Sequence, residues 1–163
     1  MSERTGYDKM RAGDPYPNPD WDLIGLQAEA RRKLDRFNAA PTSDFAVRSA
    51  MLADMLGSFG KSMVLSPLTF EEGRHIHIGD AVFVNFDCVF LDGADVRIGD
   101  GSVVAPRVQF LTATHPTDPR ERILVMGIYK DFVPKTEAAL AAFLDNFGTR
   151  ITATPTAFGL VAA

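Results

Sequence analysis

The sequence is poor in the features that mark several classes of protein. It has one cysteine in 163 residues, Cys88, so no disulfide can form within the chain. No apolar run approaches the roughly 20 residues of a membrane-spanning helix, and MSERTGYDKMRAGDPYP lacks the basic start and apolar core of a secretory signal. The net charge is −4, whereas nucleic-acid-binding surfaces are usually basic. We therefore expect a cytoplasmic protein with no membrane or nucleic-acid partner, in which Cys88 is a buried apolar side chain rather than a nucleophile.

Histidine is also scarce, with only His75, His77 and His115. Because His75 and His77 alternate along a predicted strand, both are expected to face outward, away from Ile76 and Ile78. A three-histidine metal site is the alternative, but no pair of histidines follows His115 at close spacing. We therefore expect no metal.

The first 60 residues are predicted to form an arm and a helical hairpin. Residues 1–20 have no regular period, which indicates an extended arm or loop. Between 22 and 58, two apolar stripes at helical spacing predict two helices, with Asp20 or Asp22 capping the first and Ser43 or Asp44 the second. The stripes are Leu23, Leu26, Ala30, Leu34 and Phe37, then Val47, Ala50, Met51, Met55 and Leu56. We expect the hairpin to pack on the segment C-terminal to it; a partner-binding surface is the alternative.

Residues 61–120 contain a period of six. The tripeptide IGD occurs at 78–80 and again at 98–100, and reading in sixes from each puts a large apolar residue first. These leading residues are Ile78, Val84, Phe90, Ile98, Val104 and Phe110. Such a period predicts a β-helix, in which each hexad is a short strand plus a turn and the leading side chain points into a triangular prism. The frames are 20 rather than 18 residues apart, which predicts a longer corner within FLDGADVR. A meander with IGD turns is the alternative.

Residues 121–163 lack hexads. KTEAALAAFLDNFGTR predicts one helix, capped by Thr136 and ended by Gly148, within an otherwise atypical tail.

Several motifs in this order carry a family resemblance: YDKMRAGDPYP, the hairpin, FEEGRHIHIGD, FVNFDCVFLD, IGDGSVVAP and LTATHPTDP. Together, from about residue 7 to 121, they resemble the maltose/galactoside O-acetyltransferase family of hexapeptide-repeat acyltransferases. The resemblance implies a left-handed parallel β-helix, a homotrimer with active sites between adjacent prisms, acetyl-CoA as co-substrate and a sugar hydroxyl as acceptor.

The resemblance also implies roles for five residues. His115, in the THP motif, would be the general base, a role that suits an imidazole because its ordinary pKa is near neutrality. Asn85 would line the acceptor site and Phe83 would form a wall for the sugar ring. Asp20, or Asn18 in its place, would supply an acidic contact to the acceptor. A structural asparagine ladder is the alternative for Asn85, and a solvated turn for His115.

The chain departs from the family after the THP motif. Hexads stop near Phe110, so the later coils that would bind CoA are missing and the cofactor-binding residues stay unassigned. A frameshift, a truncated gene or a fusion junction would each produce this tail. Two hypotheses besides the acetyltransferase therefore remain: a catalytically impaired β-helix that serves as a binding or assembly module, and a metal-dependent hydratase of the same fold.

Overall fold

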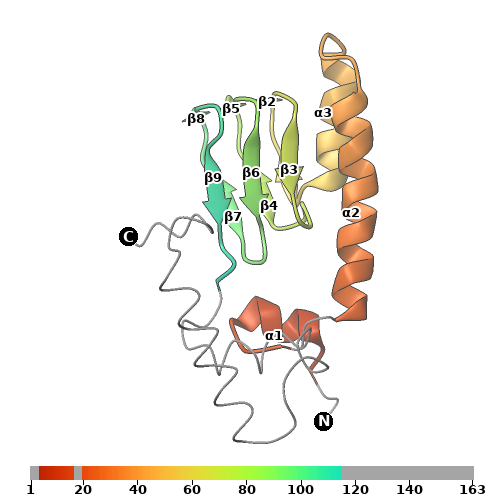
Figure 1. Cartoon of the computed structure of the whole chain (residues 1–163). Coiled ribbons are helices and arrows are strands. Elements are labelled where there is room, and N and C mark those ends of the chain that lie inside the picture. The colour runs from red at the N-terminus through yellow and green to blue at the C-terminus, as the bar shows by residue number, and fades with distance from the viewer. Residues whose placement is uncertain (1–3, 17–19, 115–163) are drawn as a thin grey trace, which may run out of the picture. The chain divides into compact units, whose positions relative to one another are not determined.

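The computed structural model describes residues 4–16 and 20–114, so the predictions for Asn18, His115 and the tail from 121 to 163 lie outside the described residues. The described residues form three helices and nine short strands (Figure 1). The helices are α1 (Gly6–Ala12), α2 (Trp21–Ala39) and α3 (Phe45–Met55). The strands are β1 (Ser58–Phe59), β2 (Met63–Val64), β3 (Leu68–Phe70), β4 (Ile76–Ile78), β5 (Phe83–Val84), β6 (Cys88–Leu91), β7 (Val96–Ile98), β8 (Val103–Val104) and β9 (Gln109–Leu111). None of these helices is long and apolar enough to cross a bilayer.

The strands form three parallel sheets, in the orders β1-β4-β7, β2-β5-β8 and β3-β6-β9. From β4 onward, each strand pairs with the strand three places before it in the chain. This is the topology of a three-sided β-helix of three coils, so the predicted prism is confirmed. Ile76 pairs with Val96, and Phe90 with Phe110, so partners lie 20 positions apart. The residues beyond three hexads lie in the corners at 71–75 and 92–95, the second of which is within the stretch that the sequence predicts as a longer corner.

The prism interior is a stack of the predicted leading side chains. Five of them are at most 8% exposed, and Phe110 is half-buried against them. The rings of Phe90 and Phe110 stack with centroids 4.6 Å apart. Burial of each such side chain contributes about 1.5–3 kcal/mol. Cys88 is fully buried, in agreement with its prediction as an apolar core residue.

Carboxylates at the corners connect successive coils. Asp100 Oδ1 accepts a hydrogen bond from the Asp80 amide at 2.7 Å, and Asp80 Oδ1 accepts one from the Lys61 amide at 2.7 Å. The aspartate of each IGD motif therefore satisfies a backbone donor of the preceding coil, which explains why the motif repeats at this position.

The α2–α3 hairpin covers the end of the prism formed by the first coil, while β7, β8 and β9 form the other end (Figure 1). The stripe predicted for α2 is largely confirmed, since Leu23, Ala30, Leu34 and Phe37 are buried. The stripe predicted for α3 is confirmed in part, since Met55 and Leu56 are buried and Met51 packs against the core. Val47 and Ala50 are exposed, whereas Arg48 and Leu52, which are not part of the predicted stripe, are buried. The reason is that the long Arg48 side chain is inserted between the helices, where backbone carbonyls accept its hydrogen bonds.

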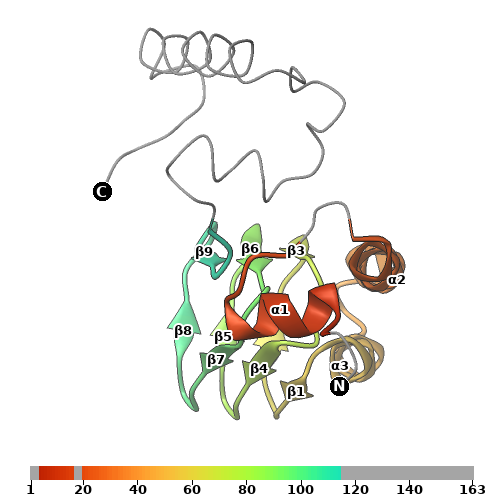
Figure 2. The same ribbon diagram turned by 90° about the horizontal axis from the view of Figure 1, so that it is seen from below.

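The N-terminal arm is partly helical, which corrects the prediction of an extended segment. Residues Gly6–Ala12 form α1, which begins at a capping box. Thr5 Oγ1 accepts from the Asp8 amide, and the Asp8 carboxylate accepts from the Thr5 amide. The helix ends at Gly13, whose φ of 75° suits glycine. Seen from below, α1 lies across the prism at the side where sheet β3-β6-β9 ends (Figure 2).

Candidate active site

The long corners after β3 and β6, together with the chain that leaves β9, contain most of the buried polar side chains of the described residues. Asp92 Oδ1 accepts from the amides of Glu71 and Glu72 at 3.1 and 2.9 Å. Thr112 Oγ1 accepts from the Ala94 amide at 2.8 Å and donates to the Leu91 carbonyl at 2.6 Å. Each coil therefore fixes the corner of the coil before it. His115, the predicted base, follows Thr112 by three residues in the sequence, so the chain that leads to it departs from this corner.

Three titratable side chains are buried in the corner: Glu72, His75 and Asp92. His75 is 4% exposed, so the prediction that it faces solvent is wrong. The error arises because β4 begins at Ile76, and the alternation of strand side chains does not extend back to residue 75. His75 Nδ1 lies 2.6 Å from the Asp92 carbonyl oxygen. His77, which is within β4, does point outward and is half-buried.

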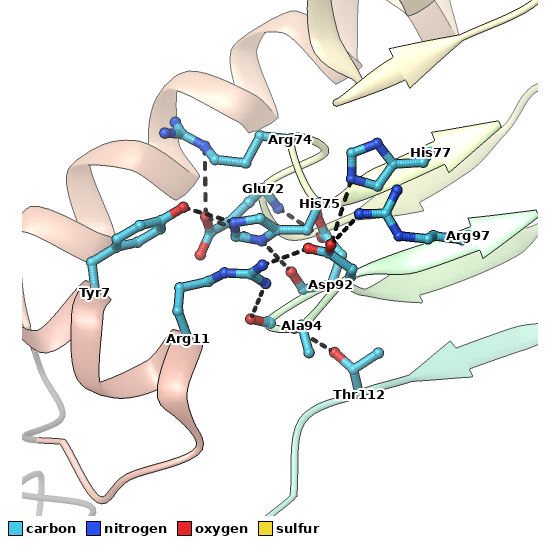
Figure 3. Close-up of polar contacts among 12 residues, drawn as sticks. Tyr7, Arg11, Glu72, Arg74, His75, His77, Asp92, Ala94, Arg97 and Thr112 are labelled. Carbon is cyan, nitrogen blue, oxygen red and sulfur yellow. Dashed lines mark hydrogen bonds and ion pairs between the residues drawn. The ribbon is translucent and has the colours of Figure 1, made fainter.

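Helix α1 covers this corner with two side chains (Figure 3). Tyr7 Oη lies 2.8 Å from His75 Nε2, and the two rings stack with centroids 5.8 Å apart. Arg11 donates to the Gly93 carbonyl and forms an ion pair with Asp95. The N-terminal arm therefore helps to form the candidate site by covering its buried groups. Sequence reasoning missed Tyr7, Arg11 and Glu72; the capping box at Thr5 was the available signal for the helix that positions the first two.

Burial sets the electrostatics of the corner. It raises the pKa of Glu72 to about 7, with the charge of Asp92 adding to the effect and Arg74 opposing it. Burial also lowers the pKa of His75, against the effect of its hydrogen bond to the Asp92 carbonyl. The pKa of Tyr16 is raised by burial and by the charges of Glu71, Glu72 and Asp20. The corner is therefore rich in carboxylates and holds an imidazole whose burial favours its neutral form.

Phe83 and Asn85 lie at the corner between β5 and β6, which is at the opposite end of β6 from the long corner. Phe83 lies in β5, half-buried, with Met63 and Val103 as its neighbours in register. Asn85 is half-buried in the turn before β6, and its Oδ1 accepts from the Phe86 amide at 2.9 Å. Within the described ranges, no hydrogen bond from the Asn85 side-chain NH₂ group is found, so this donor remains for a ligand or a partner.

Asp20 lies at the start of α2 and caps it. Its Oδ1 accepts from the amides of Asp22 and Leu23, both at 3.1 Å, which confirms the predicted cap. A side chain at Gly6 would collide with the Asp20 carboxylate, so Asp20 also lies against the start of α1. Tyr16 lies near enough to Asp20 and to Glu71 and Glu72 of the long corner for their charges to raise its pKa. Asn85 lies at the other end of β6.

Neither metal ligands nor a complete catalytic set occurs in the described part of the chain. Residues 4–16 and 20–114 contain no group of three His, Cys, Asp or Glu side chains arranged to hold a metal ion. Ser58 Oγ, His77 and Asp95 align on the outer face of β1-β4-β7, at 3.2 Å and 3.9 Å. However, Asp95 is already paired with Arg11 and Arg97, so it is not available to orient His77 as a base.

Comparison with known proteins gives a consistent set of matches. Residues 9–60 match the family model described as the maltose acetyltransferase hexapeptide capping motif. The chain is 37% identical to Nodulation protein L of Rhizobium meliloti over 73% of its own length and 66% of that protein. It resembles the crystal structure of a maltose O-acetyltransferase from Clostridium difficile, with a TM-score of 0.73 and 32% identity over 76% of this chain and 67% of that one.

A hexapeptide-repeat acetyltransferase from Vibrio cholerae, complexed with acetyl coenzyme A, is also similar. Its TM-score is 0.64 at 35% identity, covering 73% of this chain and 64% of that one. The chain spans 61–66% of the length of three of the curated relatives that it matches. The resemblance therefore covers the prism and the helices before it, but only part of each relative.

Proposed function

The chain belongs to the maltose/galactoside O-acetyltransferase family of hexapeptide-repeat acetyltransferases, and from this premise we propose that it transfers an acetyl group from acetyl-CoA to a hydroxyl of a sugar. The sugar belongs to the maltose, glucose or galactoside class, and no metal takes part. The observation that carries the proposal is the match of a three-coil prism, with its N-terminal helices, to relatives that are named acetyltransferases.

The chemistry needs a base that removes the hydroxyl proton as the sugar oxygen attacks the thioester carbonyl. We assign this role to His115. A ring nitrogen takes the proton, the C–S bond breaks, and the proton passes to the departing CoA thiolate, which leaves as the thiol. General base catalysis of this kind contributes about 10²- to 10⁴-fold to the rate. The remaining acceleration comes from holding the two reactants together.

We assign the acceptor site to residues from two ends of the prism. Asn85 and Phe83 would line it from the β5 end, and Asp20, or Asn18, would contact the acceptor from the N-terminal arm. Since Asn85 and the long corner lie at opposite ends of β6, we propose a homotrimer in which each site lies between two prisms. We further infer that the β-helix is left-handed, as in this class of fold.

The proposal is tested by acetyl transfer from acetyl-CoA to maltose, glucose and a galactoside. We expect the native chain to acetylate one of these sugars and His115→Ala to be at least about 100-fold slower. Thr69→Val, a change on an exposed strand position, serves as a control for handling and folding. Equal rates in the native chain and His115→Ala would remove His115 from the mechanism.

A second candidate function is a binding or assembly module without catalysis. It is favoured by the exposed apolar side chains of Met63 and Val103, which lie on either side of Phe83 on the outer face of β2-β5-β8 and suit a contact with a partner. This alternative predicts no saturable binding of CoA in a calorimetric titration. Binding of CoA together with sugar acetylation would reject this alternative. Binding of CoA without acetylation would reject the acetyltransferase and indicate a module that binds CoA.

A further inference from the structure

Two buried carboxylates in the long corner each have an oxygen without a hydrogen-bond partner. These atoms are Glu72 Oε2 and Asp92 Oδ2, on side chains that are 4% and 0% exposed as residues. Asp92 Oδ1 accepts two backbone amides, an arrangement suited to an ionised carboxylate. The cations nearest to Glu72 Oε2 are too distant for hydrogen bonds, with Arg74 Nε at 3.7 Å and His75 Nδ1 at 3.8 Å. Two ionised carboxylates here would be costly acceptors with no donor between them.

The contacts of His75 favour a neutral imidazole. Its Nδ1 faces the Asp92 carbonyl oxygen at 2.6 Å, and because a carbonyl only accepts, Nδ1 must carry a hydrogen. Its Nε2 faces the Tyr7 hydroxyl at 2.8 Å, which is able to donate. The imidazole therefore needs no second proton to satisfy both of its nitrogens. An imidazolium at a residue only 4% exposed would in addition carry a desolvation cost.

We propose that Glu72 and His75 form a buried pair without net or separated charge in weakly acidic solution, and that docking of α1 onto this corner transfers one proton from the His75 imidazolium to the Glu72 carboxylate. The proton leaves Nε2, which then accepts the hydrogen of the Tyr7 hydroxyl. It arrives on Glu72 and gives the pair of carboxylates a donor. The number of bound protons does not change, so the transfer is internal to the protein.

The surrounding charges fit this arrangement. From α1, Arg11 lies near Glu72, but its guanidinium is committed to Asp95 and to the Gly93 carbonyl. On the corner itself Arg74 is partly exposed, and Glu71 has a charge of the same sign as Glu72. From the β6–β7 corner, Asp92 repels an ionised Glu72. The phenols of Tyr7 and Tyr16 complete the set of titratable groups.

The linkage signs of the two groups oppose each other. Glu72 has a pKa of about 7 in the fold against an ordinary value of 4.5. Its contribution to stability is therefore fully present below pH 4.5 and is lost as pH rises through 7. His75 has a lowered pKa, so its contribution is present above 6.5 and is lost as pH falls. Between about pH 4.5 and 6.5 the two groups change the stability of the native chain in opposite directions, so their pH dependences offset each other. A single substitution removes the cancellation.

Magnetic resonance of protein labelled with ¹³C-glutamate and ¹⁵N-histidine tests the charge state directly. At pH 6 we expect a protonated Glu72 carboxyl and an unprotonated His75 Nε2, with Glu72→Gln and His75→Gln assigning the two signals. The Glu72 carboxyl is expected to titrate with a midpoint near 7. An imidazolium beside an ionised carboxylate at pH 6 would overturn the proposal.

Amide hydrogen exchange of residues 4–16, corrected for the intrinsic effect of pH, tests the coupling to α1. In Glu72→Gln, protection of α1 should fall as pH drops from 7 to 5, because only His75 titrates. In His75→Gln it should fall as pH rises over the same range, on the order of tenfold. The native chain should change less than either variant, and Glu29→Gln, on the exposed face of α2, should match it. Slopes of the same sign in both variants, or no slope in either, would reject the coupling.

Discussion

Asn85 and Asp92 lie at opposite ends of one strand: Asn85 precedes Cys88, where β6 begins, and Asp92 follows Leu91, where β6 ends. Four strand residues separate them, a distance of roughly 10 Å or more. The chain toward His115 leaves β9 at the end that corresponds to Asp92, because Leu91 pairs with Leu111. A site that uses both Asn85 and His115 is therefore most simply built from two copies of the chain.

Mixed assemblies test this division of the site. Asn85→Ala and His115→Ala are each expected to be inactive as pure proteins. When they are denatured, mixed in equal amounts and refolded together, about a quarter of the sites should receive both native residues and recover activity. The measurement is the rate of sugar acetylation, with each variant refolded alone as its control. A mixture as inactive as its components would indicate that both residues act within one chain.

The outer face of β2-β5-β8 provides a test of the trimer. Met63, Phe83 and Val103 are neighbours in register there, and Met63 and Val103 are 40% and 77% exposed. If this apolar ladder packs against another prism, Val103→Lys places a charge in the interface and should shift the protein from trimer to monomer in analytical ultracentrifugation. Gln109→Lys, an exposed position in β9 on a different face of the prism, should shift it less. Trimers that persist in Val103→Lys would show that this face is free.

Thr112 offers a prediction about the approach to the proposed base. Thr112→Val keeps the shape but removes the hydroxyl that joins Ala94 to Leu91, leaving the Ala94 amide without its acceptor. We expect a loss of about 1–3 kcal/mol in the free energy of unfolding. Because His115 follows closely, the acetylation rate should also fall by about tenfold or more. Thr112→Ser should restore both, and Thr69→Val should change neither; a destabilised Thr112→Val with a native rate would separate the corner from catalysis.

The prism could be predicted from sequence because its signal repeats. Ile78 and Ile98 occupy equivalent positions in successive coils. Because both must fill the interior of the prism, apolar residues recur at a regular spacing that can be recognised in a single sequence. The extra residues at the long corner were also visible as an interruption of that period. The capping aspartates were predicted equally well, since Asp20 and Asp44 act within three residues of their own positions.

The errors arose where a distant contact determines the local structure. His75 is buried because Tyr7, 68 positions earlier, lies against it, and no local pattern carries that information. Arg48 is buried because carbonyls from α2 and β2 surround it, whereas helical periodicity assigns a charged side chain to the surface. The candidate site depends on such contacts, so sequence alone indicated Asn85 and His115 through resemblance but did not indicate Glu72.

Arg48 is a buried charged side chain whose hydrogen-bond partners are backbone carbonyls. Its Nη1 donates to the carbonyls of Phe37 and Ala40 at 3.1 and 3.2 Å, and its Nη2 donates to that of Val64 at 3.4 Å. The guanidinium also lies 4.0 Å from the centre of the Phe37 ring. These contacts connect the two helices of the hairpin to the first coil, because Phe37 lies in the last turn of α2, Ala40 is the C-cap of α2 and Val64 belongs to β2.

Arg48→Met retains much of the apolar stem but removes the guanidinium that donates to three carbonyls, of which that of Phe37 keeps the Ala40 amide as a donor. We therefore expect the free energy of unfolding to fall by about 3 kcal/mol in urea titrations. Arg48→Lys should recover only part of this, because an ammonium group does not reproduce the planar fork of the guanidinium. Arg32→Met, an exposed change of the same kind on α2, should leave stability nearly unchanged. If Arg48→Met were as stable as the native chain, the hairpin would be held by its apolar stripe alone, and the three carbonyls would be satisfied by water that enters in place of the guanidinium.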